Sequence, residues 1–213
     1  MTRTEIIEAV KAKMDEVHPL DAGVTIVDPQ IDKQLDQAAK SLLGMLPVSL
    51  CDPIKGGPGS TNFENYPFEI DKKERYTEIK CPDNFYRLYM LRLKGWHKGI
   101  TSLLPPNSYI RRTTSRTPYG IYYNAGGDQY IKCYPPSAEV EDFLFIAEPG
   151  AAETLDDGLL EFLAWHTASV VFSIAGQDKE AQSCSVRLME TIAARTPHVA
   201  APMIKSNVTI RGM

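Results

Sequence analysis

The stretch Cys81-Pro82-Asp83-Asn84-Phe85-Tyr86-Arg87-Leu88-Tyr89-Met90-Leu91-Arg92-Leu93-Lys94-Gly95-Trp96 decides the fold class of this chain. Pro82-Asp83 is a turn signal, and the run from Phe85 to Leu93 is dominated by aromatic, branched and long apolar side chains, which favour a β-strand. Side chains alternate between the two faces of a strand. The predicted faces are Phe85, Tyr89, Leu91 and Leu93 on one side and Tyr86, Leu88, Met90 and Arg92 on the other. Helical segments flank this run on both sides, so it predicts a sheet inserted into a helical body.

Two amphipathic helices are predicted before the strand. The first spans about residues 4–17, with apolar side chains at helical spacing and with Thr2 and Glu5 in the register of a capping box. The second begins at Asp28, the expected N-cap, because a proline follows at the first helical position. Pro47 ends it.

A glycine-rich loop insertion is predicted over residues 48–76, where no helical or strand period holds. At its centre lies Lys55-Gly56-Gly57-Pro58-Gly59-Ser60-Thr61. A phosphate-binding loop needs glycines followed by a lysine and a hydroxyl at the start of a helix. Here the lysine comes first, a proline removes one amide, and no helix is expected to follow. A plain loop is therefore preferred over a nucleotide site.

Short strands separated by turns follow the loop. They are predicted at residues 74–80, 85–93, 108–113, 121–123, 130–134 and 142–147. The clearest hairpin signal is Asn124-Ala125-Gly126-Gly127-Asp128, since glycines supply the positive φ values of tight turns. The connections are too short for helical crossovers, which predicts a mostly antiparallel β module over residues 77–150.

Two further helices are predicted after the module. Thr154-Leu155-Asp156-Asp157 opens the third, which reaches about Gly176, and the fourth runs from Asp178 to Pro197. The short connection between them predicts an antiparallel pair. Residues 198–213 have no period and are expected to form an extended C-terminal tail.

The fold class predicted from these elements is α+β. The helical body, residues 1–47 and 151–197, is a bundle of about four helices, two N-terminal and two C-terminal, that carries the inserted module. The composition of the 213 residues, 43% hydrophobic and 23% charged, is that of a packed globular protein. The formal net charge of −4 argues against general electrostatic capture of nucleic acid.

The cysteines and histidines do not predict a cofactor or a metal site. The four cysteines and four histidines are dispersed, without a C-x-x-C pair, so zinc is not expected. The start at Met1 has no apolar run typical of a signal peptide, and no segment has the length of a membrane span. Reduced thiols, and synthesis in a cytoplasm, are therefore expected.

Catalysis has two candidate residues, which define one alternative function. His166 could act as a general base, with Glu161 a turn and a residue before it, or Cys133 could act as a nucleophile. Catalysis requires a nucleophile and an orienting group that converge on the base, and no spacing in the sequence predicts this. A half-buried helix residue is the preferred interpretation of His166, and a small hydrolase or ligand-binding enzyme remains an alternative.

Aromatic and cationic residues define a candidate partner interface. Its predicted members are Trp96, Tyr109, Arg111, Arg112, Tyr119, Tyr122 and Tyr123 in the module, with Pro202, Ile204 and Ile210 in the tail. The same cluster of tyrosines and cations includes Arg116, Tyr130 and Lys132. Tyrosine and arginine are enriched in the energetic centres of protein interfaces. The same residue types can stack on bases and pair with phosphates, so a single-stranded nucleic-acid-binding protein is the second alternative.

The order of these features resembles a known family. The segments that carry the resemblance are Thr4-Glu5-Ile6-Ile7, Asp28-Pro29-Gln30-Ile31, Pro82-Asp83-Asn84-Phe85-Tyr86-Arg87-Leu88, Leu93-Lys94-Gly95-Trp96, Tyr130-Ile131-Lys132-Cys133-Tyr134-Pro135, Asp142-Phe143-Leu144-Phe145-Ile146-Ala147-Glu148-Pro149 and Leu155-Asp156-Asp157-Gly158-Leu159-Leu160. Together they resemble the head-tail connector proteins of tailed bacteriophages, the adaptor or ring proteins below the portal, including those of short-tailed and crAss-like phages. The resemblance covers most of the chain from Thr4 to about Arg195.

The resemblance implies a structural virion protein of the head-tail neck, without enzymatic activity or cofactor. It implies assembly into a ring of about twelve copies, with contacts to neighbouring copies, to the portal protein above and to the next tail or neck protein below. Viral DNA would pass through the channel without specific binding, and no membrane is involved. The insertion at residues 48–76 departs from the compact family pattern, so contacts made there are not carried over.

Overall fold

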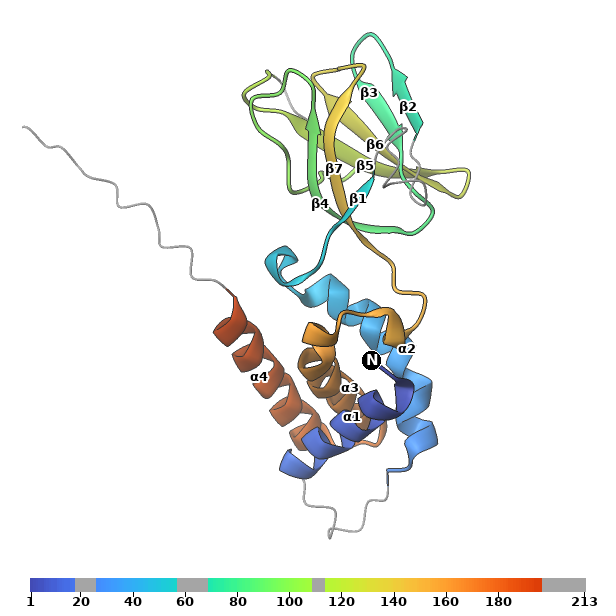
Figure 1. Cartoon of the computed structure of the whole chain (residues 1–213), viewed down its shortest axis with the longest axis vertical. Coiled ribbons are helices and arrows are strands. Elements are labelled where there is room, and N and C mark those ends of the chain that lie inside the picture. Colours follow the sequence, from blue (N-terminus) through green and yellow to red (C-terminus); the bar gives the residue numbers. More distant parts are fainter. Residues whose placement is uncertain (18–25, 57–68, 109–113, 197–213) are drawn as a thin grey trace, which may run out of the picture.

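The chain folds into a helical body and a β module stacked end to end, as Figure 1 shows for the computed structural model. The structure describes residues 1–17, 26–56, 69–108 and 114–196. Four α-helices and two antiparallel sheets confirm the predicted α+β class. No helix among these residues is long and apolar enough to cross a bilayer.

The helical body packs around one central helix. Its helices are α1 (Arg3–Val17), α2 (Asp28–Met45), α3 (Leu160–Ile174) and α4 (Asp178–Arg195). Helix α3 packs against each of the other three, and its apolar residues are buried almost all round. The sequence places five residues of α4 on one inward face; Ala181, Cys184, Leu188 and Ile192 are buried, whereas Ser185 is exposed.

At the start of each N-terminal helix, the backbone N–H of the N-cap residue donates to the side chain three residues later. The predicted capping box at α1 is confirmed, since the Thr2 N–H donates to Glu5 Oε2 at 2.7 Å and the Glu5 N–H donates to Thr2 Oγ1 at 3.3 Å. At α2 the prediction is off by one residue. Asp28 is already helical, and the N-cap is Val27, whose N–H donates to Gln30 Oε1 at 3.1 Å.

The third helix begins later than predicted. The turns η3 (Ala152–Thr154) and η4 (Asp157–Leu159) precede α3, which starts at Leu160. The Asp156 side chain accepts a hydrogen bond from the Gly158 N–H at 2.6 Å and so caps the η4 turn instead of opening the α-helix. The predicted end is confirmed by Gly176, whose φ of +73° lies in the left-handed region.

The β module consists of two antiparallel sheets. The first has the order β1 (Ile54–Gly56), β7 (Val140–Ala147) and β4 (Phe85–Leu93). The second has the order β2 (Glu69–Lys72), β3 (Thr77–Lys80), β6 (Asp128–Tyr134) and β5 (Tyr119–Ala125). Apolar side chains from both sheets form a common core, separate from the core of the helical body. The predicted hairpin is confirmed, with φ of +63° at Gly126 and +95° at Gly127 between β5 and β6.

Residues 48–76 are not a plain loop, which corrects the prediction. They contain the turn η2 (Val48–Leu50) and the strands β1 and β2. These strands are only three and four residues long, and they are stabilised by pairing with β7 and β3 rather than by local propensity. Residues 57–68 lie outside the described residues. So do residues 109–113 of the strand predicted at 108–113, and Ser108 itself is not in a strand.

The strict alternation predicted for β4 is wrong. Its register against β7 shifts between Phe85 and Arg87 and again between Leu88 and Met90. Each bulge changes which side chains point inward. Leu88 therefore joins Phe85 and other inward residues in the core of the module.

Hydrogen bonds and an ion pair join the helical body to the β module where β4 meets the end of α2. The Tyr86 hydroxyl donates to the Lys40 carbonyl at 2.9 Å, and Tyr86 packs against the core of the helical body. Arg87 Nη1 donates to the carbonyls of Leu46 at 2.7 Å and Leu43 at 3.3 Å. Glu148, just after β7, forms an ion pair with Lys40. These contacts fix the module on the C-terminal turn of α2.

Candidate functional site

The outer face of the β2-β3-β6-β5 sheet carries a cluster of half-buried tyrosines, which we call the tyrosine face. Tyr119 and Tyr134 are paired across β5 and β6, with ring centroids 4.8 Å apart and an interplanar angle of 16°. Tyr123 and Tyr130 form a second outward-facing aromatic pair, at 5.3 Å and 20°, with Ile121 opposite Lys132 between the two pairs. Tyr76 contacts Tyr134 at 5.8 Å. Such cross-strand pairs stabilise the sheet and present a rigid aromatic surface.

One cation sits within the tyrosine face. Lys132 Nζ lies 4.4 Å from the ring centroid of Tyr123 and 5.1 Å from that of Tyr76, which are cation–π distances. Glu78 pairs with Lys132 in the ladder and accepts a hydrogen bond from the Tyr123 hydroxyl. Burial, and then this hydrogen bond and charge, raise the pKa of the Tyr123 hydroxyl, which stays protonated. The cation is thus engaged by neighbouring residues of the same sheet.

The structure separates the predicted interface residues. Tyr119 and Tyr123 lie on the tyrosine face, whereas Tyr122 points inward, with its ring centroid 6.3 Å from that of Phe85. Trp96 is only 5% exposed and its indole N–H donates to the Pro135 carbonyl at 2.9 Å, so it belongs to the core. The remaining predicted members, Tyr109, Arg111, Arg112, Pro202, Ile204 and Ile210, lie outside the described residues.

Two members of the tyrosine face, Tyr76 and Tyr134, were not in the predicted cluster of tyrosines and cations. Tyr134 could have been found by counting outward along both strands from the Gly126-Gly127 turn, because the register places it opposite Tyr119. Tyr76 lies just before β3, and no local signal in the sequence connects it with Tyr134.

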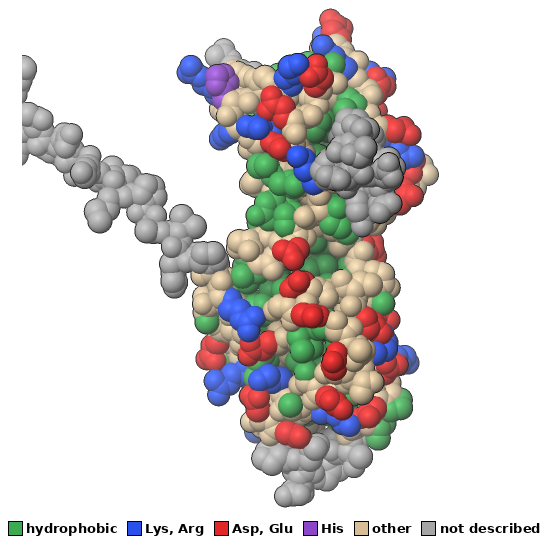
Figure 2. Space-filling model, viewed as in Figure 1, with side chains coloured by type: hydrophobic (Ala, Val, Ile, Leu, Met, Phe, Trp, Pro, Cys, Tyr) green, Lys and Arg blue, Asp and Glu red, His purple; other side chains and the backbone are tan. Residues whose placement is uncertain are grey.

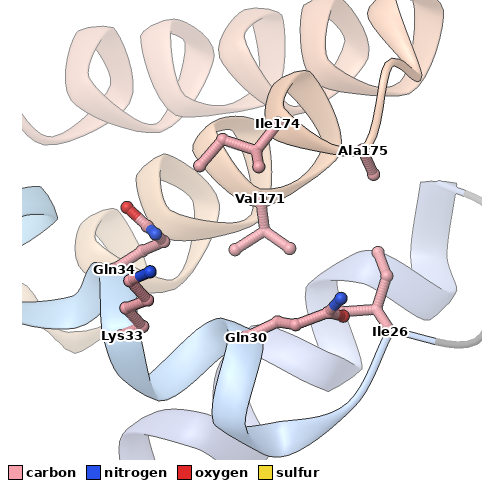
Figure 3. A pocket seen from close by; sticks show the side chains of 7 residues that line it. All are labelled: Ile26, Gln30, Lys33, Gln34, Val171, Ile174 and Ala175. Carbon is pink, nitrogen blue, oxygen red and sulfur yellow. The ribbon is translucent and has the colours of Figure 1, made fainter.

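A second candidate surface is a groove at the end of the helical body farthest from the module. Figure 3 shows this α2/α3 groove, whose apolar walls are Val171, Ile174 and Ala175 of the α3 end and Ile26 ahead of α2, while the polar Gln30 and Gln34 of α2 also line it. Lys33 of α2 stands at its rim. The cavity has a volume of about 230 Å³, which is room for a single long side chain.

The candidate base His166 is paired with a serine rather than a carboxylate. Its Nε2 lies 2.6 Å from Ser41 Oγ, across the contact between α2 and α3. The Ser41 hydroxyl also lies 3.1 Å from the Ala38 carbonyl, so its one proton serves either this carbonyl or the imidazole, according to the tautomer of His166. Glu161 pairs with Arg195 at 2.5 Å.

The cysteines are arranged as structural thiols. Cys133 is fully buried, and burial raises its pKa far above the usual range. Burial likewise raises the pKa of Cys81 to about 12 and that of Cys184 to about 11. Thiols held protonated in apolar surroundings are poor nucleophiles and poor metal ligands. Within residues 1–17, 26–56, 69–108 and 114–196, no group of histidine, cysteine or carboxylate side chains could hold a metal ion.

No protein-family model matches the chain, and no curated protein matches it significantly. The chain is an α+β protein in which a helical body and a β module are joined by hydrogen bonds, and each carries a candidate contact surface. What such a molecule does follows from the chemistry of those surfaces.

Proposed function

We propose that this chain is a structural protein of a phage virion, a head-tail connector that forms a ring below the portal. The observation that carries the proposal is the pair of unlike surfaces on one unit, the tyrosine face on the module and the α2/α3 groove on the helical body. The two bodies are stacked end to end (Figure 1). A ring built from heterologous contacts, placed between two different partners, requires several distinct surfaces on each copy. The chain would be made in the host cytoplasm and function in the neck of the virion.

The charge of the surface is compatible with passage of DNA without specific binding. The formal net charge is −4. Figure 2 shows acidic and basic side chains interspersed on the viewed face, without a continuous basic patch. A channel wall of this kind would not hold phosphates, because binding of DNA depends on many cationic contacts.

Hydrolase chemistry has weaker support. Glu161, the carboxylate considered together with His166, pairs with Arg195 and so does not orient the imidazole. Cys133 lies in a core that excludes water and substrate. Loss of a measurable activity on replacing His166 would restore this alternative.

Single-stranded nucleic-acid binding is a second candidate, favoured by the stacked tyrosines around Lys132. Against it, the cation is already engaged by Tyr76 and Tyr123, and a carboxylate, Glu78, faces it across the ladder. This candidate requires an affinity for short oligonucleotides that falls as salt rises. Absence of such binding would remove it.

The connector is tested by mass measurement of the purified chain mixed with purified portal protein. We expect a complex that contains many copies of the chain per portal ring. If the chain never associates with the portal and stays a stable monomer in every buffer tested, the connector proposal fails.

A further inference from the structure

The most exposed large apolar side chains of the described residues gather in two places. Val186 and Met189, 51% and 59% exposed, lie on the outer side of α4. Ile174 and Val27, 66% and 46% exposed, lie at the α2/α3 groove and beside its Ile26 wall. Met45, at the end of α2 near the module, is apart from both. Exposed apolar groups that cluster in this way mark contact sites.

Helix α4 carries two apolar stripes rather than one. The stripe toward α3 is Ala181, Cys184, Leu188 and Ile192. The second stripe, which we call the α4 seam, is exposed and consists of the apolar Val186, Met189 and Ala193, preceded by the polar Gln182. Its spacing of four, three and four residues is the narrow period with which one helix packs against another. A solvated helix face has no need of this period, so the seam fits a helical partner.

The seam and the groove cannot meet within one copy. Helices α2 and α4 pack against different sides of α3, and the seam faces away from α3 (Figure 1). A contact between them therefore joins two copies through unlike surfaces. Contacts of this kind close into a ring or extend into a filament.

Shape and charge both match the seam to the groove. The groove runs between two helices and has room for one long side chain, and methionine fills irregular apolar gaps well. Lys33 at the rim has no ion-pair partner among the residues that the structure describes. Glu190 flanks the seam next to Met189 and forms an exposed ion pair with Arg187. Docking the seam brings this carboxylate toward the cation.

We propose that the α4 seam of one copy docks into the α2/α3 groove of the next, with Met189 in the cavity and Val186 against Ile174. This inference rests on the proposed ring and names the interface that closes it. The occupant of the groove is a second copy of this chain.

Disulfide cross-linking between copies tests the inference. The four native cysteines are buried, so engineered thiols dominate the reaction. We expect a mixture of the Ile174→Cys and Met189→Cys variants to give a mixed disulfide dimer under mild oxidation, and the double variant to give a ladder of multimers. The Met45→Cys variant is the matched control, since Met45 is 51% exposed but lies outside both surfaces. Its mixture with Met189→Cys should give no more than random cross-linking.

Two results would overturn the inference: Met189→Cys cross-links with itself as readily as with Ile174→Cys, or the mixed pair does not exceed the Met45 control. The reactions are run with the chain alone and with purified portal present. Portal association without the Ile174–Met189 cross-link overturns the interface and keeps the connector. The cross-link without portal association keeps the interface and overturns the connector.

A charge substitution provides an independent readout. Met189→Asp should shift the assembled species to the mass of the monomer, because a carboxylate would be buried in the groove. Met45→Asp should leave the assembled mass unchanged. Both side chains are exposed in the free chain, so the melting temperatures of the two variants should match that of the wild type. Assembly of Met189→Asp at wild-type mass would overturn the inference.

Discussion

Arg87 acts as a helix cap supplied from a distant strand. The last carbonyls of an α-helix have no partner within the helix, and a guanidinium placed beside them satisfies two at once while its charge favours the negative end of the helix dipole. Here Nη1 reaches Leu43 O and Leu46 O at the end of α2. A single side chain thus couples the stability of α2 to the position of β4.

We expect Arg87→Met to lower the free energy of unfolding by about 1–3 kcal/mol, because it leaves two half-buried carbonyls without a charged donor. Methionine keeps much of the length of the side chain, so the lost packing is small. Arg187→Met is the control, since Arg187 forms only an exposed ion pair with Glu190 and should cost less than about 0.5 kcal/mol. Urea denaturation measures both variants, and equal losses would contradict the capping role.

His166 should make the stability depend on pH. Burial lowers the pKa of His166 below the ordinary histidine value of about 6.5, so the unfolded chain binds more protons than the folded chain between the two pKa values. Stability is therefore complete above about pH 6.5 and falls as the pH drops through that value toward the folded pKa.

Replacing His166 with glutamine should flatten this part of the profile, as measured by urea denaturation at a series of pH values. The exposed His97 provides the control, and His97→Gln should keep the wild-type slope. If His166→Gln retains the full slope between about pH 7 and pH 5, the half-buried imidazole is not its source.

Among the elements, the contact between α2 and β4 offers a sharper test, because Gly44 sits directly under Tyr86. A Cβ at Gly44 would lie 2.9 Å from the Tyr86 hydroxyl oxygen but 3.9 Å from the ring carbon that bears it. An alanine in a helix is otherwise favoured over glycine by about 1 kcal/mol. Whether Gly44→Ala raises or lowers the free energy of unfolding therefore depends on the Tyr86 hydroxyl oxygen.

We expect Gly44→Ala to destabilise the wild type, because it displaces the hydroxyl from its bond to Lys40 O. In the Tyr86→Phe background the same change should stabilise by up to about 1 kcal/mol. Denaturation of the four proteins of this double-mutant cycle gives the coupling energy directly. Additive effects would show that the two elements do not meet as described.

The elements that the sequence predicts well are those whose signals are local. The β5–β6 hairpin follows from Gly126 and Gly127, and β4 has the predicted bounds. The strands β1 and β2 escape prediction because partners far along the chain stabilise them. The inward orientation of the Leu88 side chain could not be predicted either, because the bulge that causes it depends on the register of β4 against β7.

The candidate surfaces divide in the same way. Tyr119 and Tyr123 could be predicted from composition along one strand, whereas Trp96 was predicted as an interface residue and is buried. Its burial depends on the Pro135 carbonyl, which only the folded module brings to the indole. The α2/α3 groove joins residues near 30 with residues near 174, a juxtaposition that no spacing in the sequence indicates.

For the whole molecule, we expect residues 198–213, the C-terminal tail, to be the element that docks on the portal protein. The core of the helical body draws on residues up to Ile192. Deleting residues 198–213 should therefore leave the melting temperature unchanged while abolishing assembly on the portal. Calorimetry and mass measurement with portal check the two halves of this prediction. Rings that still form on the portal would show that the tail is not the docking element.

The module also leaves and rejoins the helical body at adjacent points. Its first and last strands, β1 and β7, are paired with each other, Ile54 opposite Phe145, so the two crossings lie about one strand spacing, roughly 5 Å, apart. Replacing residues 53–147 by a short glycine linker should leave a chain that still unfolds cooperatively as helices, measured by circular dichroism. A non-cooperative transition would contradict this.

Because the chain enters and leaves the module at neighbouring points, the module is a domain insertion that another domain can replace. A different domain could be spliced into the same site during evolution without rethreading the four helices. Recombination could then replace the surface offered to one partner while the surface offered to the other is inherited unchanged.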